Sequence, residues 1–434
     1  MFSQRILKQL ANTPSNSDRS RLERRSGRIA FSNPDFTRYW FARVLSVFGT
    51  EMLNATVLWQ MWKLTRDPFD LGLVGLAQFA PFFALFLISG VMADRFQRKR
   101  IIAFCSIGMT IVATGLFAVT LTDIASRLTI LPLLVIVGIA RAFQAPALNA
   151  IVPVLVPKEH FANAISWSAT ATYIARIGGP ALMAGLLILG IDVVYAITIG
   201  FFVTSSLLTL LIRTNTQIIS KDPVTIDLLL AGLKYIWSRQ IIIGAIGLDL
   251  FAVLLGGATA LLPIFASEIL KVGEIGYGGL RMALTVGAIT CMTYLTQRPI
   301  QKHGGRFLLT AVALFGAGTI VFGISTLFWL SFGVLFCMGV ADAISVFIRN
   351  MLVQSVTPDD MRGRVNAVSS VFIGASNEIG EFESGVTAAW WGVVPAVVVG
   401  GIGTILVVII FARMLPQLRT VDSLKPDDLI SKYR

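Results

Sequence analysis

Residues 90–100 read GVMADRFQRKR, a short charged stretch that separates two long apolar runs. The runs at 71–93 and 101–121 contain no charged residue, and each is long enough to cross the roughly 30 Å hydrocarbon core of a bilayer as a helix. The whole chain has the same character, because 55% of its 434 residues are hydrophobic and only 14% are charged. Soluble domains carry about 25% charged residues. The composition therefore predicts an all-α membrane protein, since uninterrupted apolar runs favour helices over a barrel.

Twelve apolar runs are long enough to span the membrane. They cover 37–63, 71–93, 101–121, 130–152, 163–189, 192–212, 240–266, 276–297, 307–327, 329–352, 365–389 and 392–414. Twelve spans place both termini on one side, and 27 of the 36 Lys and Arg residues fall on that side or at its helix ends, against four on the other. The positive-inside rule then predicts cytoplasmic termini in the inner membrane. The net charge of +12 is thus explained by topology, and nucleic acid is not an expected partner.

The two halves of the chain contain similar sequence patterns at an offset of about 203 residues. Pro157 and Asn163 precede and open one span, and Pro358 and Asn366 do the same in the second half. Transporters built from such repeats bind their substrate between the halves. We therefore predict a disordered basic tail at 1–35, a six-helix bundle at 36–213, a cytoplasmic linker with an amphipathic helix at 214–239, a second six-helix bundle at 240–415 and a cytoplasmic C-terminal tail at 416–434.

The hinge at 90–100 resembles the signature between the second and third helices of the major facilitator superfamily. The residues that match it are Gly90, Asp94, Arg95, Arg98 and Lys99. Position 97 is Gln where the signature has a second glycine. The resemblance implies two pseudo-symmetric six-helix bundles, and a gating role for the hinge. In that role the Asp94 carboxylate accepts hydrogen bonds at the start of the helix near 365 and holds the cytoplasmic ends of the halves together.

Two further stretches resemble motifs of the same superfamily. In GIARAFQAPA, Arg141 and Gln144 are kept, and the resemblance implies that Arg141 takes part in proton coupling. In RIGGPALMAGLL, Gly179 and Pro180 match a pattern typical of exporters. Within the superfamily the chain is most similar to the branch of enterobactin exporters and macrolide efflux proteins. This similarity is carried by residues 33–49, 155–164, 228–240 and 357–368.

Charged side chains inside the spans mark candidate functional positions, because each costs about 3 kcal/mol to bury in a bilayer. The candidates for substrate binding or proton coupling are Glu51, Arg141, Arg176, Asp249, Glu378 and Glu381. Glu378 and Glu381 lie three residues apart and share a helix face, where two carboxylates do not readily both ionise. Such a carboxyl is able to carry a proton. The sequence leaves open that some of these acids only pair with Arg141 or Arg176 and hold helices together.

Other polar and aromatic residues in the spans receive structural interpretations. Arg349 is expected to form an ion pair with Asp342, which precedes it by seven residues on the same helical face. Arg281 is placed near the outer interface of its span. Trp59 and Trp62 are placed in an interfacial aromatic belt.

The residues therefore predict a secondary transporter rather than an enzyme, with no cofactor and no metal site. Its expected partners are a small-molecule substrate, protons and membrane lipids, and it is expected to be a monomer. Our leading hypothesis is proton-coupled export of a small amphipathic molecule, of the siderophore or drug kind, by alternating access. The sequence leaves open an importer or facilitator of an iron chelate or lysophospholipid, and a transporter-like sensor without flux.

Overall fold

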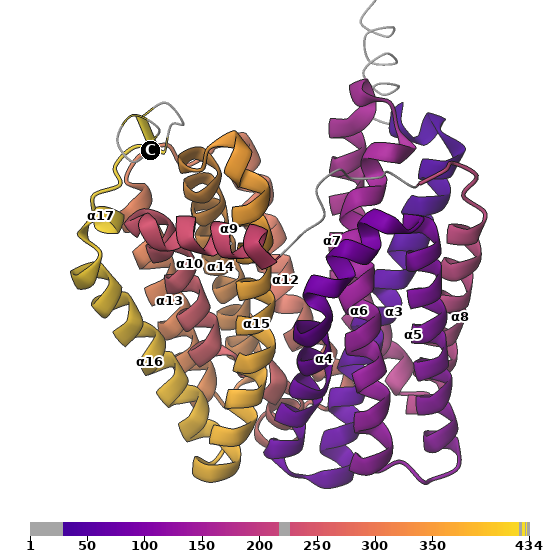
Figure 1. Cartoon of the computed structure of the whole chain (residues 1–434). Coiled ribbons are helices and arrows are strands. Elements are labelled where there is room, and N and C mark those ends of the chain that lie inside the picture. Colours follow the sequence, from indigo (N-terminus) through magenta and orange to yellow (C-terminus); the bar gives the residue numbers. More distant parts are fainter. Residues whose placement is uncertain (1–28, 217–225, 425–427, 430, 432–434) are drawn as a thin grey trace, which may run out of the picture.

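The chain is helical throughout the part that a computed structural model describes, which comprises residues 29–216, 226–424, 428–429 and 431. Within those ranges the only pairing of the β type is an isolated bridge between Lys302 and Ser423. Two groups of long helices stand beside each other and approach most closely at one end (Figure 1). We call that end the outer end, and the opposite end, which carries the C-terminus and the hinge, the inner end.

The first group contains six long helices, in agreement with the spans predicted for this half. They are α3 (Pro34–Thr65), α4 (Pro68–Arg95), α5 (Arg98–Leu121), α6 (Arg127–Leu155), α7 (Phe161–Leu187) and α8 (Ile191–Leu210). Short 3₁₀ turns, η1 (Ile29–Ser32) and η2 (Lys158–His160), precede α3 and α7. The predicted tail up to residue 28 lies outside the described part of the chain.

The second group also contains six spans, and its first span is broken. The elements are α10 (Gln240–Gly256), α12 (Gly273–Gln297), α13 (Gly304–Ile324), α14 (Phe328–Val356), α15 (Asp359–Trp391) and α16 (Val393–Met414). The span that α10 begins continues through η3 (Ala258–Leu261), α11 (Leu262–Ile264) and a π-helical turn, η4 (Phe265–Ile269). A short helix, α17 (Pro416–Arg419), follows α16.

Helix α9 (Ile226–Ser238) lies across the second group near its inner end (Figure 1). It packs on α10 and α15. The approach to α15 is close, because a Cβ atom at Gly232 would come within 2.9 Å of the Arg364 carbonyl oxygen. The described C-terminal part of the joining segment, α9, is therefore packed on the second group.

Three of the twelve spans are less apolar than the others. Among the described residues, nine stretches are long and apolar enough to cross a membrane, and they include the broken span over Gln240–Ile269. The remaining three spans, α3, α7 and α15, have 32, 27 and 33 residues. They have the length to span the bilayer, but they carry ionisable side chains in their middle turns. A helix of this kind must turn its charges away from lipid.

The halves touch mainly through α4 against α15 and α7 against α12. Small residues allow this approach: a Cβ atom at Gly385 in α15 would lie 2.6 Å from the backbone nitrogen of Gly72 in α4. In α12, a Cβ atom at Gly278 would lie 2.8 Å from the Pro180 carbonyl oxygen of α7. Two pairs of backbones thus meet at the outer end with almost no side chain between them.

Side chains at the end of α3 complete the outer closure. The Trp62 indole N–H donates to Ser267 Oγ at 2.8 Å, and Arg66 forms an ion pair with Glu268. The Trp59 ring stacks on Tyr277 at a centroid distance of 5.2 Å. The prediction that Trp59 and Trp62 belong to an interfacial belt was wrong, because both are buried where the two halves meet.

Close backbone packing within the second group generates a stability prediction. A Cβ atom at Gly287 in α12 would lie 2.0 Å from the Phe336 carbonyl oxygen of α14, whereas one at Gly333 would meet nothing within 4 Å. We expect Gly287→Ala to lower the free energy of unfolding by about 1–3 kcal/mol, because the helices must move apart. Thermal unfolding of the purified protein in detergent measures this. Gly333→Ala is the matched control and should leave stability unchanged or slightly raised. Equal behaviour of the two variants would contradict the packing described here.

Candidate substrate cavity between the two halves

A cavity of about 400 Å³ lies between the halves, inward of the outer closure. Its wall includes residues of α3 and α7 from the first half and of α10, η3, α12, α13, α14 and α15 from the second. The three less apolar spans, α3, α7 and α15, contribute to it through Glu51, Arg176 and Glu381. These three charged side chains therefore face the cavity and not lipid.

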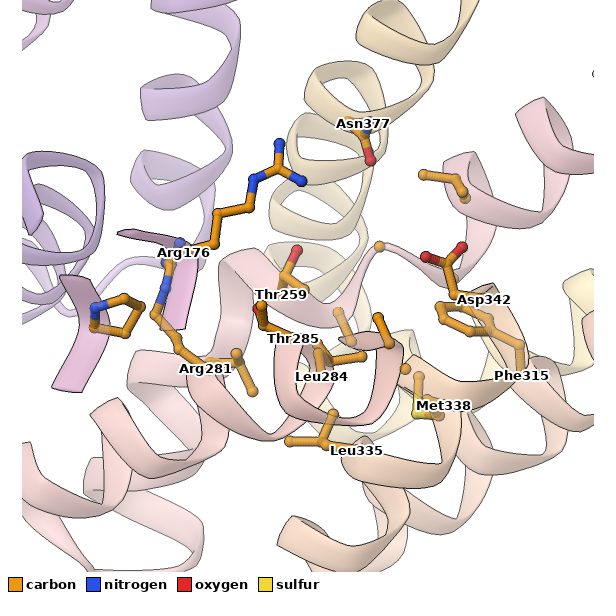
Figure 2. A pocket seen from close by; sticks show the side chains of 18 of the residues that line it. Arg176, Thr259, Arg281, Leu284, Thr285, Phe315, Leu335, Met338, Asp342 and Asn377 are labelled. Carbon is orange, nitrogen blue, oxygen red and sulfur yellow. The ribbon is translucent and has the colours of Figure 1, made fainter. Parts of the chain in front are cut away.

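Two arginines mark one side of the cavity (Figure 2). Arg176 Nε lies 3.6 Å from Glu51 Oε1, so this ion pair links α7 to α3 within the first half. Arg281 of α12 donates to the Tyr277 hydroxyl at 3.2 Å. That hydroxyl in turn donates to the Ala55 carbonyl oxygen of α3 at 3.1 Å, which connects the two halves.

Gly179 and Pro180, the predicted exporter-like pair, lie in α7 against this wall. A Cβ atom at Gly179 would lie 2.8 Å from Glu51 Cβ, so glycine at this position lets α7 pack against α3 beside the Glu51 carboxylate. Pro180 itself lines the cavity. These two residues therefore shape the cavity wall in this structure.

Unlike the Glu51–Arg176 pair, the ion pair between Arg141 and Glu378 joins the two halves. Arg141 Nη1 of α6 lies 2.9 Å from Glu378 Oε1 of α15, and it also donates to Gln78 Oε1 of α4 at 3.2 Å. Glu381, one turn further along α15, contributes to the cavity wall. The two predicted acids of α15 thus have different surroundings, since one is paired with arginine and the other faces the cavity.

Asp249 lies elsewhere, in a buried ion pair with Arg349 that joins α10 to α14. It is absent from the wall of the main cavity. The expected pair between Arg349 and Asp342 was wrong, because the neighbouring helix brings a carboxylate closer than the same helix does. Asp342 faces the cavity instead.

Arg281 was placed wrongly at the outer interface. It lies about two turns into α12, but the outer ends of the halves close over it, so its side chain lines the cavity. The sequence did contain a signal for this residue, because a charge within an apolar run indicates a functional position. Its place near the end of the helix suggested exposure at the membrane surface, which the contact between the halves prevents. Neutral polar residues of the wall, such as Thr259, Thr285 and Asn377, were missed because such residues are common throughout the spans (Figure 2).

The hinge residues lie at the inner end, away from the cavity. Arg98 Nη1 donates to the Ala150 carbonyl oxygen at 2.8 Å, and Lys99 Nζ donates to the Ile212 carbonyl oxygen at 2.8 Å. These two cations therefore bind the ends of α6 and α8 within the first half. Asp94 and Gly90 belong to α4, but what surrounds them lies outside the described part of the chain, so the gating latch stays a prediction.

Comparison with known proteins places this arrangement among membrane transporters. The sequence profile of a family described as transmembrane secretion effectors, a branch of the major facilitator superfamily, matches residues 26–432. The chain belongs to this family. Its curated relatives include the enterobactin exporter EntS of Citrobacter koseri, which is 26% identical over 89% of this chain and 93% of that protein. EntS of Shigella dysenteriae is 24% identical with the same coverages.

Solved structures share the fold of this transporter. The bacterial homologue of the human lysosomal transporter Spinster, inward-facing and occupied, superposes with a TM-score of 0.69 at 15% identity over 88% of this chain and 95% of its own. The nucleoside transporter NupG gives a TM-score of 0.70 at 13% identity over 88% of this chain and 99% of its own. The predicted all-α fold, with twelve helices in two six-helix bundles, is confirmed.

The Asp249–Arg349 pair generates a test of structural against coupling roles. Asp249→Asn leaves the Arg349 charge buried without its partner, so we expect the free energy of unfolding to fall by about 3–5 kcal/mol. The double variant Asp249→Asn with Arg349→Gln should recover most of that loss. Thermal unfolding in detergent measures both. A stable Asp249→Asn protein that has lost the pH dependence of its transport would instead assign Asp249 to coupling.

Proposed function

We propose that the protein is a proton-coupled exporter of a small amphipathic molecule and works by alternating access in the inner membrane. The observation that supports this most directly is the cavity, which both halves line and into which Glu51, Arg176 and Glu381 project ionisable groups. A site between two repeats near mid-membrane is where secondary transporters bind their cargo. The relatives whose names describe exporters favour the outward direction.

The packing of the halves supports alternating access. They meet at the outer end through α4–α15 and α7–α12, and they diverge toward the inner end (Figure 1). If both termini are cytoplasmic, as the distribution of Lys and Arg predicts, this conformation faces the cytoplasm and is ready to accept cargo. Rocking of the halves would then close the inner end and open the outer one.

The two acids of α15 provide a means of coupling that movement to protons. Glu378 holds Arg141 across the interface of the halves, so neutralising its carboxylate removes an attraction between them. Glu381 faces the cavity and lies against Gly75 of α4, where a Cβ atom would be 3.3 Å from Glu381 Oε2. Proton uptake at Glu381, and at Glu378 when the halves separate, would tie the cargo-free return step to the proton gradient.

Inverted vesicles with an acidic interior and a pH-sensitive dye test this function. We expect one of four cargo classes (siderophores, macrolides, cationic dyes or lysolipids) to collapse the gradient. Glu381→Gln should reduce the initial rate of collapse about tenfold or more, as is typical for loss of a positioned proton carrier. Glu378→Gln should also slow it. Glu274→Gln is the control, because its exposed pair with Lys63, at 3.9 Å, contributes less than about 1 kcal/mol.

The outcomes separate the open alternatives. Collapse that survives both substitutions in α15 would keep proton antiport and remove these two residues as its carriers. Cargo movement without any change of the gradient would indicate a facilitator or an importer. No movement of any cargo by folded, inserted protein would contradict the proposed transport of these compounds.

A further inference from the structure

Asp342 occupies the side of the cavity that lies away from the two arginines (Figure 2). It belongs to α14, and its half-buried side chain has apolar neighbours in the cavity wall, among them Phe315 of α13 and Met338 of α14. The opposite side carries Arg176 and Arg281. The cavity is therefore polarised, with guanidinium groups on one side and a carboxylate next to an aromatic ring on the other.

Asp342 makes no ion pair or hydrogen bond with any of the residues that the structure describes. The charged groups that face its surroundings are already engaged in other contacts. Arg349, two turns along the same helix, is held by Asp249 of α10. Arg176 is the cation whose field reaches Asp342, but its guanidinium is paired with Glu51.

A smaller void reaches Asp342 from within the second half, and its lining is mostly apolar. This void is lined by Asp342, Asp249 and Ser345 among apolar residues. The Ser345 hydroxyl is buried there without a hydrogen-bond partner in the described chain. None of the described residues that line this void is cationic, and Arg349 on the same helix is already paired with Asp249. The carboxylate is thus left with the main cavity as the place from which a counter-charge is able to come.

The charges of the cavity wall do not balance. Three carboxylates (Glu51, Asp342 and Glu381) face two guanidiniums (Arg176 and Arg281), which leaves one negative charge. Adding the neighbouring Arg141–Glu378 pair leaves the excess unchanged. Glu51 and Glu381 lie near the arginines, so the excess resides at Asp342. An unpaired charge in low dielectric is costly, and a bound cation removes that cost.

We propose that Asp342 is a cation-binding subsite and that the cargo is a monocationic amphipathic molecule. Its positive group binds between the Asp342 carboxylate and the Phe315 ring, where carboxylate attraction and cation–π attraction act together. Its apolar body lies along the wall formed by residues such as Leu335 and Met338. This inference rests on the proposed transport function, because it specifies the class of cargo that the same cavity accepts.

Equilibrium binding to the full-length protein in nanodiscs tests the subsite without requiring transport. The probes are tetraphenylphosphonium and tetraphenylborate, which have nearly the same shape and opposite charge. We expect the wild-type protein to bind the phosphonium more tightly. Asp342→Asn should raise the Kd of the phosphonium about tenfold or more, because one charge pair is lost. The Kd of the borate should stay unchanged or fall. Asp342→Glu keeps the charge and should retain the preference, and Glu274→Gln should change neither constant.

Each outcome bears on the subsite separately from the proposed function. Selective loss of phosphonium binding in Asp342→Asn supports the subsite even if vesicles show no proton antiport, in which case only the coupling fails. Equal phosphonium binding by the wild type and Asp342→Asn overturns the subsite. This holds even if the variant changes the pH dependence of transport. If Asp342→Asn does not fold, the wild-type measurement still decides, because a preference for the borate, or no binding of either ion, contradicts a cation subsite.

Discussion

A charge within the hydrocarbon layer requires a counter-charge or a polar cavity, and this requirement organises the whole structure. Most of the span residues satisfy it by being apolar. Five charged side chains of the spans meet at the cavity, namely Glu51, Arg176, Arg281, Asp342 and Glu381. The Asp249–Arg349 and Arg141–Glu378 pairs satisfy it by bringing opposite charges together. The same physical rule that keeps charge out of lipid produces a site that is able to bind polar groups.

The ion pairs divide into those inside one half and those between the halves, which are Arg141–Glu378 and, at the outer end, Arg66–Glu268 and Lys63–Glu274. Asp249–Arg349 joins two helices of the second half, and Glu51–Arg176 joins two helices of the first. Pairs of this kind persist when the halves move as rigid bodies. Arg141–Glu378 crosses the interface, so its geometry changes with any rocking motion. A proton that neutralises the acid of a pair within one half changes the stability of the fold. A proton that neutralises Glu378 in the Arg141–Glu378 pair changes the relative energies of the inward-open and outward-open arrangements of the halves.

Length and apolarity were sufficient to predict the twelve spans and their order, because a bilayer sets the same length for each. They were also sufficient to single out Glu51, Arg176 and Glu381, which line the cavity, since a charge in an apolar run must avoid lipid. Partners were harder to predict. The carboxylate that pairs with Arg349 comes from a helix about 100 residues earlier, and a sequence gives no distance between helices. Trp59 was misplaced for a related reason, because the contact between the outer ends of the halves is a tertiary feature.

The contact between Gly72 and Gly385 has a consequence for the speed of the proposed conformational change. Where two halves meet through interlocking side chains, opening the seam requires each side chain to leave its socket and adopt another rotamer. At this position the facing surfaces are backbone, with no room for a single methyl group. In the proposed alternating-access cycle, this part of the seam would separate without rotamer rearrangement and add little to the activation barrier. The barrier at the outer closure would then come from the side chains that cross it, such as the Trp59–Tyr277 stack and the Arg66–Glu268 pair.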